Sequence, residues 1–241
     1  MTRVLHLYGG WPGHSPYEVA AWTRGLLDEL GCDVEETQDV FRLDGDLTGY
    51  DLVVLAWNNA LTTEGLSEAQ ERGLLTAVEA GTGLAAWHGA GAAFRSSLRY
   101  HLLLGGDFVA HPAGEGFPEP YTVTVTDPEH PVTRGVRDFE VASEQYYMHV
   151  DPNNHVLAET VFGGRPWPWL AGHRCPVAWV RRWGRGRVFY HSIGHAPGDL
   201  AGADVRRLTR QGLRYAARAG TRAGTGDPRD PRDPRKQGEG S

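Results

Sequence analysis

Residues 83–94, Gly-Leu-Ala-Ala-Trp-His-Gly-Ala-Gly-Ala-Ala-Phe, decide the fold of this chain. The first five of these residues are Gly or apolar, which is typical of a short strand covered on both faces of a parallel sheet. Gly89 and Gly91 then predict a sharp turn that leads into a helix. His88 lies on that turn, where a nucleophile elbow would carry Ser or Cys. Two interpretations are open: either His88 serves a function at the carboxyl end of a strand, or it only caps the helix or bonds a neighbouring carbonyl.

Strands and helices alternate before this stretch. The apolar patterns predict strands over residues 3–8, 32–36, 51–57 and 83–87, and helices over residues 17–30 and 67–80. Gly31 and Gly81 are placed to end the two helices, and Ser67 with Gln70 resembles a capping box. This alternation predicts an α/β fold with a mostly parallel, doubly wound sheet, helices on both faces and right-handed crossovers.

The chain changes character at Gly105, where a long segment rich in Gly, Pro and aromatic residues begins. We expect an insertion-like, β-rich segment here. Further strands are predicted over residues 121–125, 144–147, 155–161, 176–182 and 187–191, and a closing helix over residues 199–217.

From Gly220 the sequence lacks large apolar side chains and repeats Asp-Pro-Arg. Such a segment cannot bury a core, so we expect one domain over residues 1–219 and a disordered tail over residues 220–241.

Composition excludes several classes of partner. The formal net charge is −6, and no Lys/Arg cluster interleaved with aromatic residues precedes the tail, so we expect no nucleic-acid partner. No apolar run approaches the ~20 residues of a membrane-spanning helix, so we expect no membrane association. Only two cysteines occur, Cys32 and Cys175, and no signal segment precedes the first strand. These features predict a cytoplasmic location.

Histidines at strand ends are the strongest candidates for function. The chain has eleven histidines, and we select the candidates among them by their position at the ends of predicted strands. His14 follows the first strand, His88 lies on the glycine turn and His195 follows the last strand, so all three should reach the same rim of the sheet. His111 and Glu144 lie in the β-rich segment, which can fold over that rim as a lid. The histidines inside predicted strands, His6, His155 and His191, are expected to be structural.

Two kinds of chemistry use several imidazoles and one carboxylate. The first is a divalent metal site, such as Zn²⁺, with His14, His88, His111 and His195 as candidate ligands and a position left open for water or substrate. The second is acid–base catalysis without metal, for which His88, Glu144 and His195 are the candidates. The turn offers no nucleophile, which disfavours a Ser or Cys hydrolase. No nucleotide is expected, because Gly9 and Gly10 lack the spacing and the Lys of a phosphate-binding loop.

Several motifs, in this order and spacing, resemble the ThuA-like (trehalose utilisation) family. They are Gly13-His14, Trp87-His88-Gly89-Ala90, Gly105-Gly106-Asp107-Phe108 with His111-Pro112, Asp127-Pro128 with His130-Pro131, Glu144-Gln145-Tyr146, Pro176-Val177-Ala178-Trp179, Gly186 to Tyr190, and Gly194-His195. The resemblance covers about residues 3–217 and implies a class I glutamine amidotransferase-like fold, a flavodoxin-like three-layer sandwich. Ser143 precedes Glu144 here, where the family usually shows an acidic pair. Because His88 stands where that fold implies a Cys, glutamine hydrolysis does not carry over.

The resemblance also implies a function in disaccharide and keto-sugar metabolism. We therefore expect an enzyme that hydrolyses or isomerises a small-molecule sugar, with Trp11, Trp57, Asn58 and Tyr146 as candidate substrate-binding residues. The alternative is a non-catalytic carbohydrate-binding or assembly module that lacks the nucleophile of the amidotransferase fold. A homo-oligomer is compatible with either interpretation.

Overall fold

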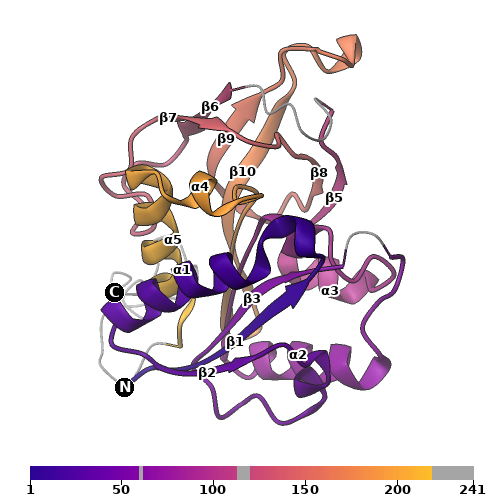
Figure 1. Ribbon diagram of the computed structural model, residues 1–241, viewed down its shortest axis with the longest axis vertical. Coiled ribbons are helices and arrows are strands. Elements are labelled where there is room, and N and C mark those ends of the chain that lie inside the picture. Colours follow the sequence, from indigo (N-terminus) through magenta and orange to yellow (C-terminus); the bar gives the residue numbers. More distant parts are fainter. Residues whose placement is uncertain (60–61, 113–119, 219–241) are drawn as a thin grey trace, which may run out of the picture.

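A nine-stranded sheet runs through the molecule (Figure 1). The computed structural model describes residues 1–59, 62–112 and 120–218. In spatial order the strands are β2 (Asp33–Thr37), β1 (Arg3–Gly10), β3 (Leu52–Asn58), β4 (Gly83–Trp87), β11 (Gly186–His191), β10 (Arg174–Trp183), β9 (His155–Val161), β6 (Pro120–Val125) and β7 (Phe139–Ala142). The predicted tail, residues 220–241, lies outside the described residues, so the expected domain boundary stays a prediction.

The first five strands in this order are parallel, and they form the part of the sheet that the sequence predicts best. β1 pairs in parallel with β2 on one side and with β3 on the other, so the connections reverse direction at β1 and β3. β4 then pairs in parallel with both β3 and β11. All five residues of β4 are buried, as expected for a strand covered on both faces. The predicted α/β class with a doubly wound sheet is confirmed.

Helices cover both faces of the sheet (Figure 1). The helices are α1 (Pro16–Glu29), α2 (Glu68–Glu79), α3 (Leu98–Leu104), α4 (Pro197–Leu200) and α5 (Ala203–Ala216). α1 and α5 bury Leu26 and Leu208 against one face in a single apolar cluster. α2 and α3 bury Leu74 and Leu103 in the cluster on the other face. Full burial of each such side chain stabilises the fold by about 1.5–3 kcal/mol.

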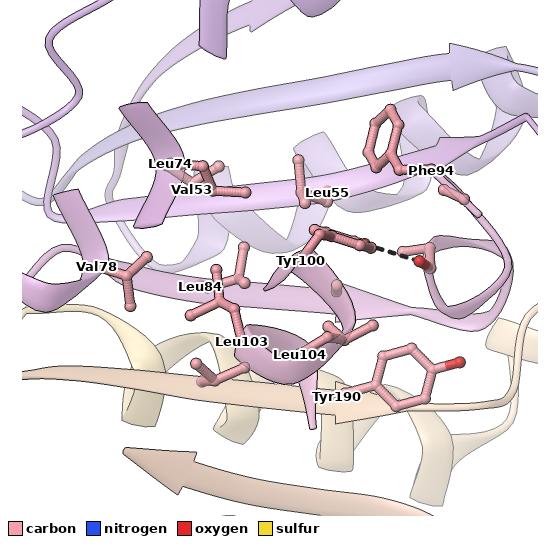
Figure 2. Packing of buried hydrophobic residues seen from close by; sticks show 14 of the residues in the cluster. Val53, Leu55, Leu74, Val78, Leu84, Phe94, Tyr100, Leu103, Leu104 and Tyr190 are labelled. Carbon is pink, nitrogen blue, oxygen red and sulfur yellow. Dashed lines mark hydrogen bonds between the residues drawn. The ribbon is translucent and has the colours of Figure 1, made fainter. Parts of the chain in front are cut away.

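Figure 2 shows the second cluster around α3. The ring of Tyr100 is fully buried among sheet residues such as Leu55, and its hydroxyl donates a hydrogen bond of 2.7 Å to the carbonyl of Ala90. Ala90 lies two residues after His88, in the turn that follows β4. The cluster therefore stabilises both the sheet and the turn that presents His88.

Local sequence explains where α2 begins. The Ser67 hydroxyl accepts the Gln70 amide N–H at 3.2 Å, and the Gln70 side chain accepts the Ser67 N–H at 2.8 Å. This reciprocal pair satisfies two backbone donors at the helix start, which confirms the predicted capping box.

Three predicted elements differ from the structure. The glycine turn after β4 continues as a 3₁₀ turn (His88–Gly91), and the next regular helix begins only at Leu98, because Gly89 and Gly91 weaken a longer helix. The predicted strand over residues 144–147 is wrong, since residues 144–146 connect β7 to β8 (Tyr147–Val150). The closing helix is two helices, α4 and α5, separated at Gly202.

The far half of the sheet is antiparallel. β10, β9, β6 and β7 each run opposite to their neighbours, and β8 pairs with β5 (Gly106–Ala110) in a separate two-stranded sheet. β5 and β7 are absent from the sequence prediction. This part corresponds to the predicted β-rich segment, and its connections carry Glu144 and His111 back to the parallel half.

Candidate functional site at the carboxyl ends of the parallel strands

Four parallel strands deliver polar side chains to one rim of the sheet. His14 lies in a 3₁₀ turn (Pro12–His14) after β1, Asn58 is the last residue of β3, His88 directly follows β4, and His195 follows β11. β1 and β3 flank the point where the strand order reverses, which is where ligands bind in open α/β sheets. The ring centroid of His14 lies 4.8 Å from that of His88 and 4.9 Å from that of His195.

The backbone holds His88 in an uncommon conformation. Its φ of 43° lies in the left-handed region, which costs energy for a residue with a side chain. The Tyr190 hydroxyl donates a hydrogen bond of 2.8 Å to the His88 carbonyl, and His88 Nδ1 donates one of 3.0 Å to the Ser192 carbonyl. Because a carbonyl only accepts, Nδ1 carries a proton, and in the neutral tautomer Nε2 presents a lone pair.

Glu144 enters the rim from the connection between β7 and β8. Its Oε2 lies 3.3 Å from Nε2 of His88, and its Oε1 lies 3.2 Å from Nδ1 of His195 and 3.8 Å from Nε2 of His111. Burial of Glu144 acts to raise its pKa, but the contacts with His195 and His88 outweigh burial and hold the pKa below its usual range. The carboxylate is therefore ionised and surrounded by imidazoles.

His14 packs against Asn58. The Asn58 amide nitrogen lies 2.5 Å from Nδ1 of His14, which leaves Nε2 of His14 for another partner. Burial and the nearby His88 and His195 lower the pKa of His14 to about 3, so its ring is neutral at neutral pH. Gly89 makes this packing feasible, because a Cβ there would lie 2.7 Å from both the His14 ring and the Asn58 amide.

Tyr146 covers the inner side of the site. Its ring stacks on His88 with centroids 4.4 Å apart, and its hydroxyl lies 3.0 Å from Nε2 of His88. Since that nitrogen carries no proton in the neutral ring, the hydroxyl donates to it. Burial raises the pKa of Tyr146 well above its usual range, which keeps the hydroxyl protonated. The ring of Phe108 also packs against Tyr146, with ring centroids 4.4 Å apart.

Four of the predicted residues form a compact set of metal-ligand types. Each of His14, His88, Glu144 and His195 offers one donor atom, and these atoms all lie within 4.8 Å of one another. His111 lies beside this group, in contact with Glu144, rather than within it. The predicted convergence of the five residues is thus present, while their predicted chemical roles remain predictions.

The predicted substrate-binding residues occupy different depths. Trp11 is half-buried at the outer edge, and its ring centroid is 4.9 Å from His14 and 6.5 Å from His195. Trp57 packs beneath Gly9, and its indole helps to line a small cavity of about 20 Å³ behind the histidines, which has room for about one water. Asn58 and Tyr146 are buried and contact His14 and His88 directly.

Sequence reasoning missed the bonds that link the loops of the site. The Ser143 hydroxyl donates a hydrogen bond of 2.5 Å to a carboxylate oxygen of Asp199, and the same oxygen accepts the backbone N–H of Ala196 at 3.1 Å. Ser143 precedes Glu144 and Ala196 follows His195, so one carboxylate connects the two loops. The only signal in the sequence was Ser143 itself, the residue that departs from the acidic pair.

The other histidines inside strands have structural partners, as predicted. His6 lies 3.1 Å from Glu36. His155 lies 2.9 Å from Asp127. The ring of His191 is fully buried and contacts the Thr209 hydroxyl at 2.9 Å.

Solved structures share this fold. A ThuA-like protein of Parabacteroides merdae ATCC 43184 superposes with a TM-score of 0.73 at 19% sequence identity, over 89% of each chain. A cytoplasmic protein of Salmonella typhimurium LT2 gives 0.60 at 13% identity, over 90% of this chain and 100% of that one. A β-galactosidase of Bacillus circulans sp. alkalophilus gives 0.57 at 15% identity, over 89% of this chain and 30% of that one. These likenesses are consistent with the class I glutamine amidotransferase-like fold.

None of the helices in the described residues is long and apolar enough to cross a membrane. The sequence matches none of the curated proteins with which it was compared. A family described as trehalose utilisation matches residues 3–216, nearly the whole of the described structure. The chain therefore belongs to the ThuA family.

Proposed function

We propose that this protein hydrolyses or isomerises a sugar or keto-sugar, using a divalent ion such as Zn²⁺ that His14, His88 and His195 hold beside Glu144. One observation carries the proposal. The Glu144 carboxylate lies 3.3 Å from Nε2 of His88, and in the neutral tautomer that donates through Nδ1 to the Ser192 carbonyl, two acceptors face each other in a buried site. Such a contact is repulsive unless a cation or a proton lies between them.

The residues fit a divalent ion. Three imidazoles with one open position are a known donor set of catalytic zinc sites. An imidazole binds a metal ion only in its neutral form, and His14 is neutral at neutral pH because its pKa is about 3. The bond from Nδ1 of His88 to the Ser192 carbonyl fixes the ring and directs Nε2 into the site, as the partners of metal-binding histidines do.

The neighbouring residues supply the remaining chemistry. A bound ion would polarise a sugar carbonyl or lower the pKa of a bound water. Glu144 is ionised, so it can accept a proton from water or from the carbon next to a keto group. The Tyr146 hydroxyl stays protonated and can donate a hydrogen bond to a sugar oxygen once Nε2 of His88 is otherwise engaged.

A sugar substrate is supported by the family and by the outer edge of the site. The family is described as trehalose utilisation. Trp11 lies at the outer edge beside His14 and His195, and a half-exposed indole offers an apolar face on which a sugar ring can stack. We also propose a cytoplasmic location for this chain, because a Salmonella typhimurium LT2 protein with the same fold is described as cytoplasmic.

A second mechanism is favoured by one contact, the hydrogen bond between Tyr146 and Nε2 of His88. If this bond persists during catalysis, His195 and Glu144 act as acid and base without a metal.

The test measures conversion of trehalose and of oxidised, keto-bearing trehalose by mass spectrometry, with and without a chelator. We expect the wild type to convert one of these sugars, the chelator to abolish the conversion and added Zn²⁺ to restore it. The Glu144→Gln variant should bind zinc but show no conversion. Conversion that survives the chelator but not Glu144→Gln would establish the metal-free mechanism. Saturable binding of either sugar without conversion would instead support the carbohydrate-binding module.

A further inference from the structure

A second pocket lies at the opposite end of the parallel strands from the histidines. It has a volume of about 420 Å³. Cys32, which directly precedes β2, and Leu52, the first residue of β3, line it, and α1 and α5 form its walls. Leu27, Leu52 and Leu213 lie beneath it and are fully buried or nearly so, so the pocket rests on the edge of the core. The volume lies within the range of small-molecule sites.

Arginines dominate the wall that α5 provides. Arg206, Arg210 and Arg214 follow one another at intervals of four residues, so they share one face of α5, and Arg218 follows the end of the helix. Arg210, Arg214 and Arg218 line the pocket. Like charges at this spacing destabilise a helix. A fifth arginine, Arg187 of β11, also lines the pocket. This concentration of positive charge is local, because the whole chain has a net charge of −6.

The first and last of these arginines, Arg206 and Arg218, have partners within the protein. Arg206 forms an ion pair with the carboxylate of Glu29. Arg218 donates hydrogen bonds to the carbonyl of Thr48 at 3.0 Å and to the hydroxyl of Thr82 at 2.8 Å. Both arginines therefore have partners that explain their positions.

The two middle arginines, by contrast, have no such partner. Within residues 1–59, 62–112 and 120–218, neither Arg210 nor Arg214 forms a hydrogen bond or an ion pair. The one acidic residue that lines the pocket, Glu29, is engaged by Arg206. Arg187 donates to the carbonyl of Tyr215 at 3.1 Å, so its charge meets no carboxylate either.

We propose that this pocket binds a small phosphomonoester, with its phosphate between Arg210 and Arg214. Guanidinium groups match phosphate oxygens with paired hydrogen bonds. The anion would also relieve the repulsion along α5. This proposal does not depend on the function proposed for the histidine site.

The test titrates the full-length protein with glucose 6-phosphate by calorimetry, with glucose and inorganic phosphate as separate probes. We expect saturable binding of glucose 6-phosphate, weaker binding of inorganic phosphate and none of glucose. Arg210→Gln and Arg214→Gln should each weaken glucose 6-phosphate binding by at least about 10-fold. The matched control is Arg72→Gln on α2, a 63% exposed arginine outside the pocket, which should bind like the wild type.

Stability gives a second readout that does not require tight binding. Without ligand, Arg210→Gln should raise the melting temperature by about 1–3 °C, since it removes two like-charge pairs. The same change should abolish the rise that glucose 6-phosphate produces in the wild type. A lower melting temperature of Arg210→Gln would mean that Arg210 stabilises the fold directly, and it would overturn the proposal.

Three binding results would also overturn it. One is the absence of glucose 6-phosphate binding. Another is an equal loss in Arg72→Gln, which would indicate non-specific attraction between charges. The third is binding of phosphatidylserine vesicles, but not of glucose 6-phosphate, through the same arginines, which would indicate a membrane surface as the partner.

Discussion

Gly89→Ala tests whether close packing around His14 builds the candidate metal site. The new Cβ would lie 2.7 Å from Nδ1 of His14 and from the Asn58 amide nitrogen, whereas ordinary contacts begin at 3.4 Å. Both side chains must therefore move away from the new Cβ by about 0.7 Å, the difference between these distances. Metal–ligand distances tolerate only about 0.2 Å. We expect Zn²⁺ affinity to fall by about 10–100-fold and the free energy of unfolding by about 1–3 kcal/mol.

The matched control is Gly25→Ala. Gly25 lies within α1, and a Cβ there would meet nothing within 4 Å. Alanine should stabilise the helix by about 0.5–1 kcal/mol and leave Zn²⁺ affinity unchanged. The assay combines competition with a chromophoric chelator for affinity and urea denaturation of the metal-free protein for stability. If Gly89→Ala binds Zn²⁺ within twofold of the wild type, His14 is not a ligand and the reasoning fails.

Three further predictions use other parts of the structure. Burial lowers the pKa of His191 to about 3 in the folded protein, whereas its pKa in the unfolded chain is about 6.5. Between these two values a proton binds the unfolded chain but not the folded one, so the stability of the fold decreases as the pH drops from 6.5 towards 3. When the pH falls from 6.5 to 5, the free energy of unfolding, measured by urea denaturation, should fall by about 2 kcal/mol less in His191→Gln than in the wild type. An equal fall in both proteins would contradict this prediction. Ser143→Ala removes the hydrogen bond to Asp199 that links the Glu144 and His195 loops, so Zn²⁺ affinity should fall about 10-fold or more. Ser143→Thr keeps the hydroxyl and should retain the affinity of the wild type. Unchanged affinity in Ser143→Ala would mean that the bond has no role at the site. Trp11→Ala should raise KM for the sugar with little change in kcat, and a fall in kcat alone would argue against stacking on the substrate.

The parallel half of the fold follows from local sequence. β4 is apolar throughout, and the capping box of Ser67 starts α2, so both elements could be placed from residues a few positions apart. The rim residues His14, His88 and His195 followed from one rule, that parallel strands present their carboxyl ends together. Periodicity and strand order therefore sufficed to predict where the site lies.

The remaining features depend on contacts between distant residues. Glu144 lies in an irregular connection held by side chains, so strand patterning misplaced it. Ser143 and Asp199 are 56 residues apart, and His88 and Ser192 are 104 residues apart, so no local pattern indicates either bond. The antiparallel strands β5 and β7 are short, and their pairing is set by tertiary packing more than by residue preference.

The central claim is that three histidines of the rim hold one divalent ion. X-ray absorption at the zinc edge, on the zinc-loaded full-length protein after dialysis, tests it most directly. We predict one zinc per chain with three imidazole nitrogens at ~2.0–2.1 Å and an oxygen from water, and loss of that zinc in His88→Ala. Protein that retains no zinc, or a spectrum that stays unchanged in His88→Ala, would contradict the claim.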